Sequence, residues 1–218
     1  MALSHIALKE KQRGLREGFP IGLSLRVHRS LSWLNRSEMA GGDSDAGFIF
    51  LWIAFNAAYS KEISNQYGAS ERNQFDDYFN RLIKLDRKHL IYDAIWQKFA
   101  GPIRLLIDNK YLFHSFWCFH NHQPGYENWE ERFQRSRKKL LLSMQTFDTR
   151  TVLNTLFERL YVLRNQTLHG GATWNSSVNR DQLRDGRAIL GFLVPIFIDL
   201  MMDHPNEDWG APYYPVVD

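Results

Sequence analysis

Apolar side chains recur with helical spacing along almost the whole chain. The clearest case is an aromatic stripe at positions i, i+4, i+7 and i+11, which consists of Phe48, Trp52, Phe55 and Tyr59. Asp43, Ser44 and Asp45 precede this stripe and are candidate N-cap residues, and Gly68 is a candidate stop signal. The pattern predicts a helix over this segment.

Two further long helices are predicted in the second half of the chain, over residues 148–169 and 179–204. The first begins at Asp148, a good N-cap residue, and carries a leucine-rich apolar stripe. Gly170-Gly171 follows it and is typical of a helix C-terminus. The second carries another apolar stripe, and we expect Pro195 to kink it because proline has no backbone N–H to donate.

Shorter helical patterns fill much of the remaining chain, over residues 23–39, 69–85, 89–99, 103–119 and 129–144. Strand signals are poor, because no alternating apolar run is joined to another by an Asn-Gly or Asp-Gly turn. The segment 207–218 contains one glycine and two prolines and is expected to be irregular. The sequence therefore predicts an all-α fold, a single domain built as a helical bundle.

The two most apolar stretches, 46–59 and 188–198, are shorter than the roughly 18 apolar residues that cross a bilayer. Residues 1–16 mix charged side chains with few apolar ones and lack the apolar segment of a signal peptide. Cys118 is the only cysteine among 218 residues, which excludes a disulfide scaffold. We therefore expect a cytoplasmic protein without a membrane partner.

The net charge is only +3, from 27 basic and 24 acidic side chains, so charge alone does not identify a nucleic-acid-binding protein. The distribution of charge is more informative, because five basic residues accompany two acidic ones between residues 130 and 139. The basic residues of this run are Arg132, Arg135, Arg137, Lys138 and Lys139. The run is either a solvated helix face or a surface that contacts RNA phosphates.

The sequence signatures of common nucleotide and zinc sites are missing, since the chain has no GxxxxGK[ST], GxGxxG or HExxH motif and no CxxC pair. One cluster contains metal-ligand residue types: His114, Cys118, His120 and His122. Its spacing matches no standard zinc site, and the aromatic residues between its members favour the end of a buried aromatic helix. We predict neither a metal nor another cofactor.

Arg164, Asn165 and His169 lie at the end of an apolar helix, directly before Gly170-Gly171. Here the sequence resembles the HEPN superfamily, whose helical domains occur in prokaryotic toxins, defence proteins and RNA-processing factors. Many members carry an Arg-polar-x-x-x-His motif near the end of a bundle helix. The resemblance covers roughly residues 44–204, because the segment 50–59 also resembles the first core helix of the larger, Apea-like HEPN proteins. Residues 1–40 form a helical extension outside it.

The resemblance implies a HEPN-like up-down bundle with extra N-terminal and inserted helices, which acts as a homodimer. It also implies a metal-independent endoribonuclease with Arg164, Asn165 and His169 as catalytic residues. These residue types suit that chemistry, because histidine moves protons near neutral pH and the guanidinium of arginine holds a phosphate. The setting of the family predicts a toxin or phage-defence effector with an RNA substrate and an antitoxin or regulatory protein as a partner.

The spacing limits how the motif works within one chain. Five helical steps place Arg164 and His169 about 140° apart, whereas Asn165 and His169 share a face. Either the helix unwinds over residues 167–169, or two chains pair their motifs across a two-fold axis. Asn56, beside the aromatic stripe, is either a structural amide or part of the same cleft.

Purely structural roles stay open for the motif. In such roles His169 caps its helix, Asn165 is a core amide, and Arg164 pairs with an acidic neighbour, either Glu158 or Asp199. The competing function is a catalytically silent HEPN-like dimer that binds RNA or a protein. Under that hypothesis the basic run matters more than His169.

Overall fold

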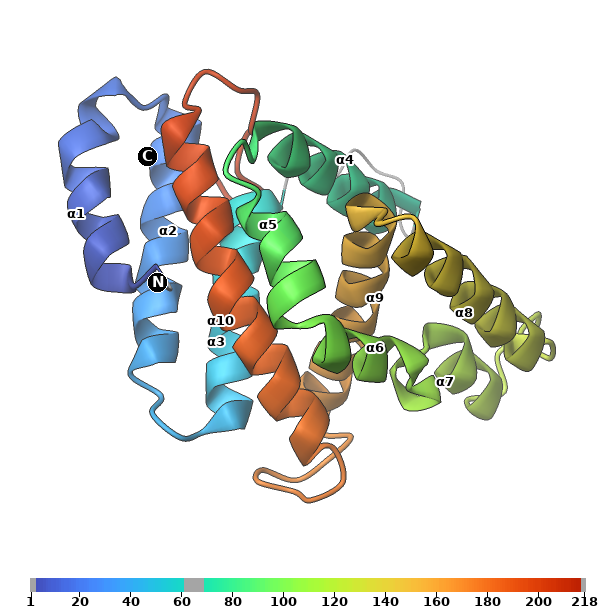
Figure 1. The fold of residues 1–218 in the computed structure, drawn as a ribbon. Coiled ribbons are helices and arrows are strands. Elements are labelled where there is room, and N and C mark those ends of the chain that lie inside the picture. The colour runs from blue at the N-terminus through green and yellow to red at the C-terminus, as the bar shows by residue number, and fades with distance from the viewer. Residues whose placement is uncertain (1–2, 61–68, 217–218) are drawn as a thin grey trace.

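The computed structural model describes residues 3–60 and 69–216, and helices are the only regular elements over these ranges (Figure 1). The α-helices are α1 (His5–Leu15), α2 (Ile21–Glu38), α3 (Ser44–Tyr59), α4 (Ala69–Leu85), α5 (Leu90–Asp93), α6 (Ala100–Asp108), α7 (His114–His120), α8 (Trp129–Gln145), α9 (Thr149–Leu168) and α10 (Arg180–Asp203). The short elements are the 3₁₀ turns η1 (Arg16–Gly18) and η3 (Lys110–Leu112) and the π turn η2 (Ala94–Lys98). The predicted all-α fold is confirmed. Within the described ranges, no helix has both the length and the apolarity that a membrane crossing requires.

The helices α2, α3 and α10 pack against one another, and α1 covers the outer side of this group (Figure 1). The helices α4 and α9 pack together and also contact α3 and α10. On its remaining sides α9 contacts α6 and α8, and α7 packs on α8. The helix that carries the Arg-Asn-x-x-x-His motif therefore lies between the main bundle and the α6–α8 layer.

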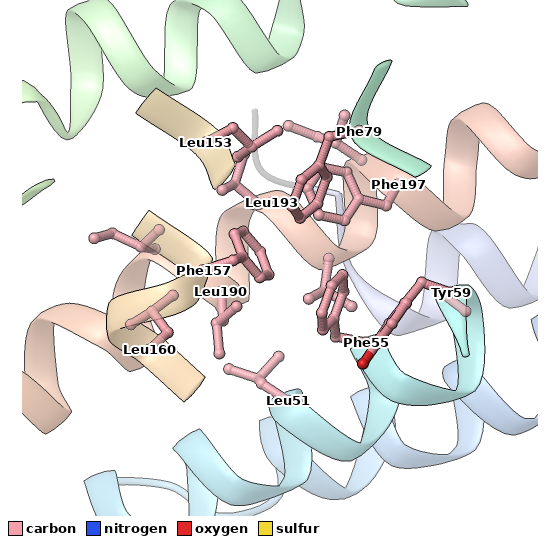
Figure 2. Packing of buried hydrophobic residues seen from close by; sticks show 14 of the residues in the cluster. Leu51, Phe55, Tyr59, Phe79, Leu153, Phe157, Leu160, Leu190, Leu193 and Phe197 are labelled. Carbon is pink, nitrogen blue, oxygen red and sulfur yellow. The ribbon is translucent and has the colours of Figure 1, made fainter. Parts of the chain in front are cut away.

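The core is centred on four phenylalanine rings, one each from α3, α4, α9 and α10: Phe55, Phe79, Phe157 and Phe197 (Figure 2). None of the four exposes any surface. The ring centroid of Phe157 lies 4.6 Å from that of Phe55 and 4.7 Å from that of Phe79, so α9 is tied to two other helices through one side chain. The aromatic stripe belongs to this core, because Phe48, Trp52, Phe55 and Tyr59 are all buried.

Two of the predicted N-caps are confirmed. The Asp43 carboxylate accepts a 3.0 Å bond from the Ala46 N–H, and α3 begins directly after it. The Asp148 carboxylate accepts a 3.1 Å bond from the Thr151 N–H at the start of α9. Each bond satisfies a first-turn donor that the helix itself leaves free. The predicted stop at Gly68 lies outside the described residues, and α3 ends earlier, at Tyr59.

The helix predicted over residues 103–119 is wrong. The chain leaves the helix at Asn109, whose backbone is extended (φ −83°, ψ 112°) and whose side chain accepts a 2.9 Å bond from the Tyr111 N–H. Phe113 is extended as well, so α6 and α7 are separate helices joined through η3. Asparagine favours this turn because its side chain competes with the backbone for hydrogen bonds. Apolar periodicity alone did not reveal the break.

Residues 1–40 and the C-terminal segment both pack on the bundle. The helix α2 contributes Leu23, Val27, Leu31 and Leu34 to the same apolar core as α3, α9 and α10. Arg26 is 1% exposed and donates to the carbonyls of Ala58 in α3 (2.9 Å) and Ala211 in the tail (2.7 Å). Over its described residues the segment after 206 has no helix, as predicted, and is fixed by such bonds rather than by regular structure.

Candidate active site

The last turn of α9 positions the motif, and it remains regular. The helix continues through Leu168, and the N–H of His169 donates to the Asn165 carbonyl at 2.9 Å. Gly170 is left-handed (φ 72°), and the Gly171 N–H donates to the Gln166 carbonyl at 2.7 Å. These are the features of a Schellman C-cap. The proposed unwinding over residues 167–169 is therefore not observed.

Both glycines of this cap have a physical reason. A side chain at Gly170 would strain a left-handed backbone, which L residues rarely adopt. A Cβ at Gly171 would lie 3.1 Å from the Gln166 carbonyl oxygen, which is tighter than ordinary contact. The Gly-Gly pair thus lets the chain turn away sharply, directly after His169.

Arg164 and Asn165 form a bonded pair on the surface of α9. Arg164 Nη1 donates to Asn165 Oδ1 at 2.7 Å, and the guanidinium carbon lies 5.4 Å from the centre of the Tyr161 ring. The Arg164 Nε is buried and has no hydrogen-bond partner among the described residues. Among the described residues no salt bridge joins Arg164 to Asp199, which accepts a 2.6 Å bond from Lys11. The guanidinium is thus held by Asn165 and Tyr161, and Arg164 remains partly exposed.

His169 is exposed at the end of the helix. Among the described residues no hydrogen bond reaches its ring, so the imidazole is available for a substrate or a second chain. No hydrogen bond joins it to Arg164 either. The two residues are linked only through Asn165, which accepts from Arg164 with its side chain and from the His169 N–H with its backbone.

Gln166 connects the motif to the α6–α8 layer, which the sequence did not indicate. Its Nε2 donates to the Tyr111 carbonyl in η3 at 2.6 Å, and the Trp117 indole donates to the same oxygen at 2.8 Å. Lys110, the neighbour of Tyr111, lines an open groove of about 730 Å³ on α8. The motif and this groove are therefore adjacent. No sequence signal reveals the link, because it depends on where the non-helical turn at Asn109 places η3.

The basic run on α8 divides into two groups. Arg137 pairs with Asp108 at 2.9 Å, and Arg132 donates to the Gly125 carbonyl at 2.8 Å, so both side chains bond groups within the protein. Arg135 and Lys138 are exposed and line the groove together with Lys110. Lys139 is exposed but does not line it. The groove floor contains the aromatic rings of Trp129 and Phe133.

Arg159, on α9, is a buried charge that the sequence analysis missed. It is 2% exposed, donates to the Ile107 carbonyl (3.3 Å) and to the Ser136 hydroxyl (3.1 Å), and stacks 4.6 Å from the centre of the Phe113 ring. These contacts tie α9 to α6 and α8. Arg159 therefore fixes the motif helix relative to the basic groove. A basic residue within an apolar stripe is the only signal that could have identified it.

The remaining candidates are placed elsewhere. Asn56 is half-buried on α3, and no hydrogen bond of the described residues connects it to the motif. In the histidine and cysteine cluster, Cys118 Sγ lies 3.2 Å from His114 Nε2. Phe113 and Phe116 pack there with Trp129 and Phe133, as expected for the end of an aromatic helix. Among the described residues no three or more histidine, cysteine or acidic side chains are grouped to hold a metal ion.

Comparison of the chain with protein-family models, with curated proteins and with solved structures gave no match in any of the three.

Proposed function

We propose that this protein is a metal-independent endoribonuclease of the HEPN type. The observation that carries the proposal is the arrangement at the end of α9. Asn165 fixes the guanidinium of Arg164, and the exposed imidazole of His169, one turn further on, has no hydrogen bond with a described residue. A fixed cation and a free histidine are the two groups that RNA cleavage requires.

The proposed reaction uses the RNA as its own nucleophile. The 2′-hydroxyl loses its proton to a base and attacks the adjacent phosphorus, and the bond from phosphorus to the 5′-oxygen breaks. The leaving oxygen takes up a proton, so the products are a 2′,3′-cyclic phosphate and a free 5′-hydroxyl. His169 moves the protons, because imidazole titrates near neutral pH. Arg164 stabilises the negative charge that builds up on the phosphate oxygens.

A second copy of the chain completes this site. Arg164 and His169 are not joined within one chain, and a two-fold axis at the end of α9 would bring each arginine toward the histidine of the other copy. Exposed apolar side chains lie within the motif at Leu168 (52% exposed) and after it at Trp174 (73%) and Val178 (82%). Such a group on one end of the molecule suits a protein interface. The proposed active form is a homodimer.

The groove on α8 is the proposed path of the RNA strand away from the cleavage site. Lys110, Arg135 and Lys138 supply positive charge, and Trp129 and Phe133 supply ring surface. Cations along a backbone and rings for base stacking are the features of single-strand binding. The bond between Gln166 and Tyr111 holds this groove next to the motif.

The proposed biological setting is a toxin or phage-defence effector in the cytoplasm, held in check by an antitoxin or regulatory protein. The alternative is a catalytically silent HEPN-like dimer that binds RNA or a protein. The contacts of Arg164 with Asn165 and Tyr161 favour this alternative if the arginine serves only to stabilise its own helix.

Cleavage of total RNA in EDTA by wild type, His169→Ala and His28→Ala separates the two functions. His28 is an exposed histidine on α2 and serves as the matched control. The nuclease predicts 2′,3′-cyclic phosphate ends from wild type and His28→Ala, and none from His169→Ala. Equal cleavage by His169→Ala rejects the proposed site, and RNA binding without cleavage by wild type supports the silent dimer.

A further inference from the structure

A cavity of about 900 Å³ lies between α1, the start of α2 and the C-terminal tail, away from the proposed active site. It is open to solvent on one side, and its lining includes Phe19, Leu23 and Pro212, with Trp209 from the tail. The tail is held in place by Arg26, which donates to the Ala211 carbonyl at 2.7 Å and to the Gly210 carbonyl at 3.2 Å. The cavity is thus built from fixed elements, and its volume lies in the range of small-molecule sites.

One side of the cavity carries positive charge without a carboxylate to balance it. Lys9, Arg13 and Arg16 follow each other at i, i+4 and i+7 along α1 and η1, and Lys9 and Arg16 line the cavity. None of the three forms an ion pair with a described residue. Lys11 on the same helix contrasts with them, because it bonds Asp199 and Asp203, each at 2.6 Å. Two of these three unpaired cations, Lys9 and Arg16, line the cavity, whereas the paired Lys11 does not.

The charged neighbours that act on Lys9 are cations. Burial, Arg13 and Arg16 lower the pKa of Lys9, in that order of importance. Two acidic residues of the tail, Glu207 and Asp208, also line the cavity. Asp208 acts on Arg26, where it partly offsets the lowering of the pKa by burial, and its carboxylate accepts from the Gly210 N–H at 2.9 Å. The lining thus combines two cations from α1 and η1 with two carboxylates from the tail.

Hydrogen-bond donors without partners face the same side. Gln12 is 4% exposed and lines the cavity, and its Oε1 accepts from Lys9 at 2.7 Å. Its Nε2 makes no hydrogen bond with a described residue. The 18-residue helix α2 begins there after Pro20 with no side-chain cap, so the N–H groups of Ile21 and Gly22 are free. An unpaired amide donor, a helix N-terminus and two cations together suit an anionic group.

We propose that this cavity binds a small amphipathic anion, with a carboxylate or phosphate head and one apolar chain. Lys9, Arg16 and the Gln12 amide hold the head at the start of α2. The apolar chain lies along Phe19, Leu23 and Pro212. Glu207 and Asp208 also line the cavity and would repel a polyanion such as RNA. The site is independent of the proposed nuclease.

Titration calorimetry of the full-length protein with octyl phosphate and octanoate tests this site, with inorganic phosphate and octanol as single-feature probes. We expect one saturable site for an octyl anion, and binding at least tenfold weaker for each single-feature probe. The stronger of the two octyl anions identifies the head group. No saturable binding of either octyl anion overturns the proposal. If inorganic phosphate binds as tightly as the octyl anion, the site holds an adventitious anion only, and the proposal is overturned. Octanol binding as tightly as the octyl anion overturns it as well.

Variants locate the binding. Lys9→Gln and Gln12→Leu should each weaken the octyl anion about tenfold, the worth of one charge-assisted hydrogen bond. Lys88→Gln changes an exposed lysine outside the cavity and should leave the affinity unchanged. Thermal unfolding of each variant checks that it is folded. Lys9→Arg keeps the positive charge, so its affinity for the octyl anion should stay within a few-fold of the wild-type value. Unchanged affinity in both folded variants overturns the proposal. His169→Ala should bind like wild type, so this result is separable from the nuclease test.

Discussion

Asn165 accepts a 2.7 Å hydrogen bond from Arg164, its neighbour in the chain, and so fixes the guanidinium on the surface of α9. Adjacent helical residues point about 100° apart, so this contact requires the arginine side chain to fold back around the helix. The same asparagine accepts the His169 N–H with its carbonyl, one turn later. Asn165 is therefore the residue that relates the two proposed catalytic groups to each other.

Replacing Asn165 with alanine should slow RNA cleavage about tenfold, because the guanidinium loses one oriented hydrogen bond. The variant should fold normally, since alanine favours the helix and the side chain is only half-buried. Single-turnover cleavage rates measure the effect. Gln166 is not a suitable control position, because its side chain bonds the Tyr111 carbonyl. Thr155→Ala on the same helix is the matched control. An unchanged cleavage rate in Asn165→Ala would mean that Arg164 needs no such support.

Alanine substitutions at two glycines, one in the Schellman cap and one inside α1, should change the free energy of unfolding differently. Gly170→Ala should lower the free energy of unfolding by about 1 kcal/mol, because its backbone is left-handed (φ 72°). Gly14→Ala should leave stability equal or raise it by up to about 1 kcal/mol, because Gly14 is helical with open space around it. Urea unfolding of both variants measures the difference. Equal effects at the two positions would contradict the observed cap.

Two adjacent lysines on α8 test the groove. Lys138 lines it and Lys139 does not, although both are exposed. Lys138→Ala should weaken single-stranded RNA binding and reduce the slope of log affinity against log salt by about 0.7, the value of one phosphate contact. Lys139→Ala should change neither. Fluorescence anisotropy over a salt series gives both numbers, and an equal loss for the two variants would mean that the run acts only as diffuse charge.

Acid should destabilise the start of α3 through Asp43. The Ala46 N–H donated to its carboxylate is the main reason that the pKa of Asp43 lies below its usual value of 3.8. Because the pKa is lower in the folded state, the carboxylate contributes stability above pH 3.8 that is lost as the pH falls through the folded pKa. Asparagine keeps the cap without the charge. The difference in unfolding free energy between wild type and Asp43→Asn should therefore shrink between pH 7 and pH 3, as measured by urea unfolding.

The sequence predicted those features that follow from local patterns. The periodic apolar positions gave α3, α9 and α10, and Asp43 and Asp148 marked two of their starts correctly, since capping depends on neighbouring residues alone. The turn at Asn109 was missed because the surrounding apolar spacing suits one long helix equally well. The contacts of Arg159 and Gln166 lay beyond prediction for another reason. Arg159 bonds residues 52 and 23 positions away in the chain, and Gln166 bonds a residue 55 positions away, and nothing in either side chain specifies these partners.

The candidate site shows the same division. Arg164, Asn165 and His169 were identified from their spacing before Gly170-Gly171, and the structure places all three on the last turn of α9 or its cap. The roles within the basic run needed tertiary structure, because only the position of Asp108 shows that Arg137 is neutralised. The pairing of two chains is a relation between molecules, which no pattern within one chain records.

Mixing two inactive variants tests the central claim, a nuclease site shared between two chains. Arg164→Ala and His169→Ala proteins are each expected to be inactive. After exchange of subunits, a mixed dimer contains one intact arginine–histidine pair across the interface. With half of the dimers mixed and one of two sites intact, cleavage should return to about a quarter of the wild-type rate. A mixture that stays as inactive as its components would contradict a site shared between two chains.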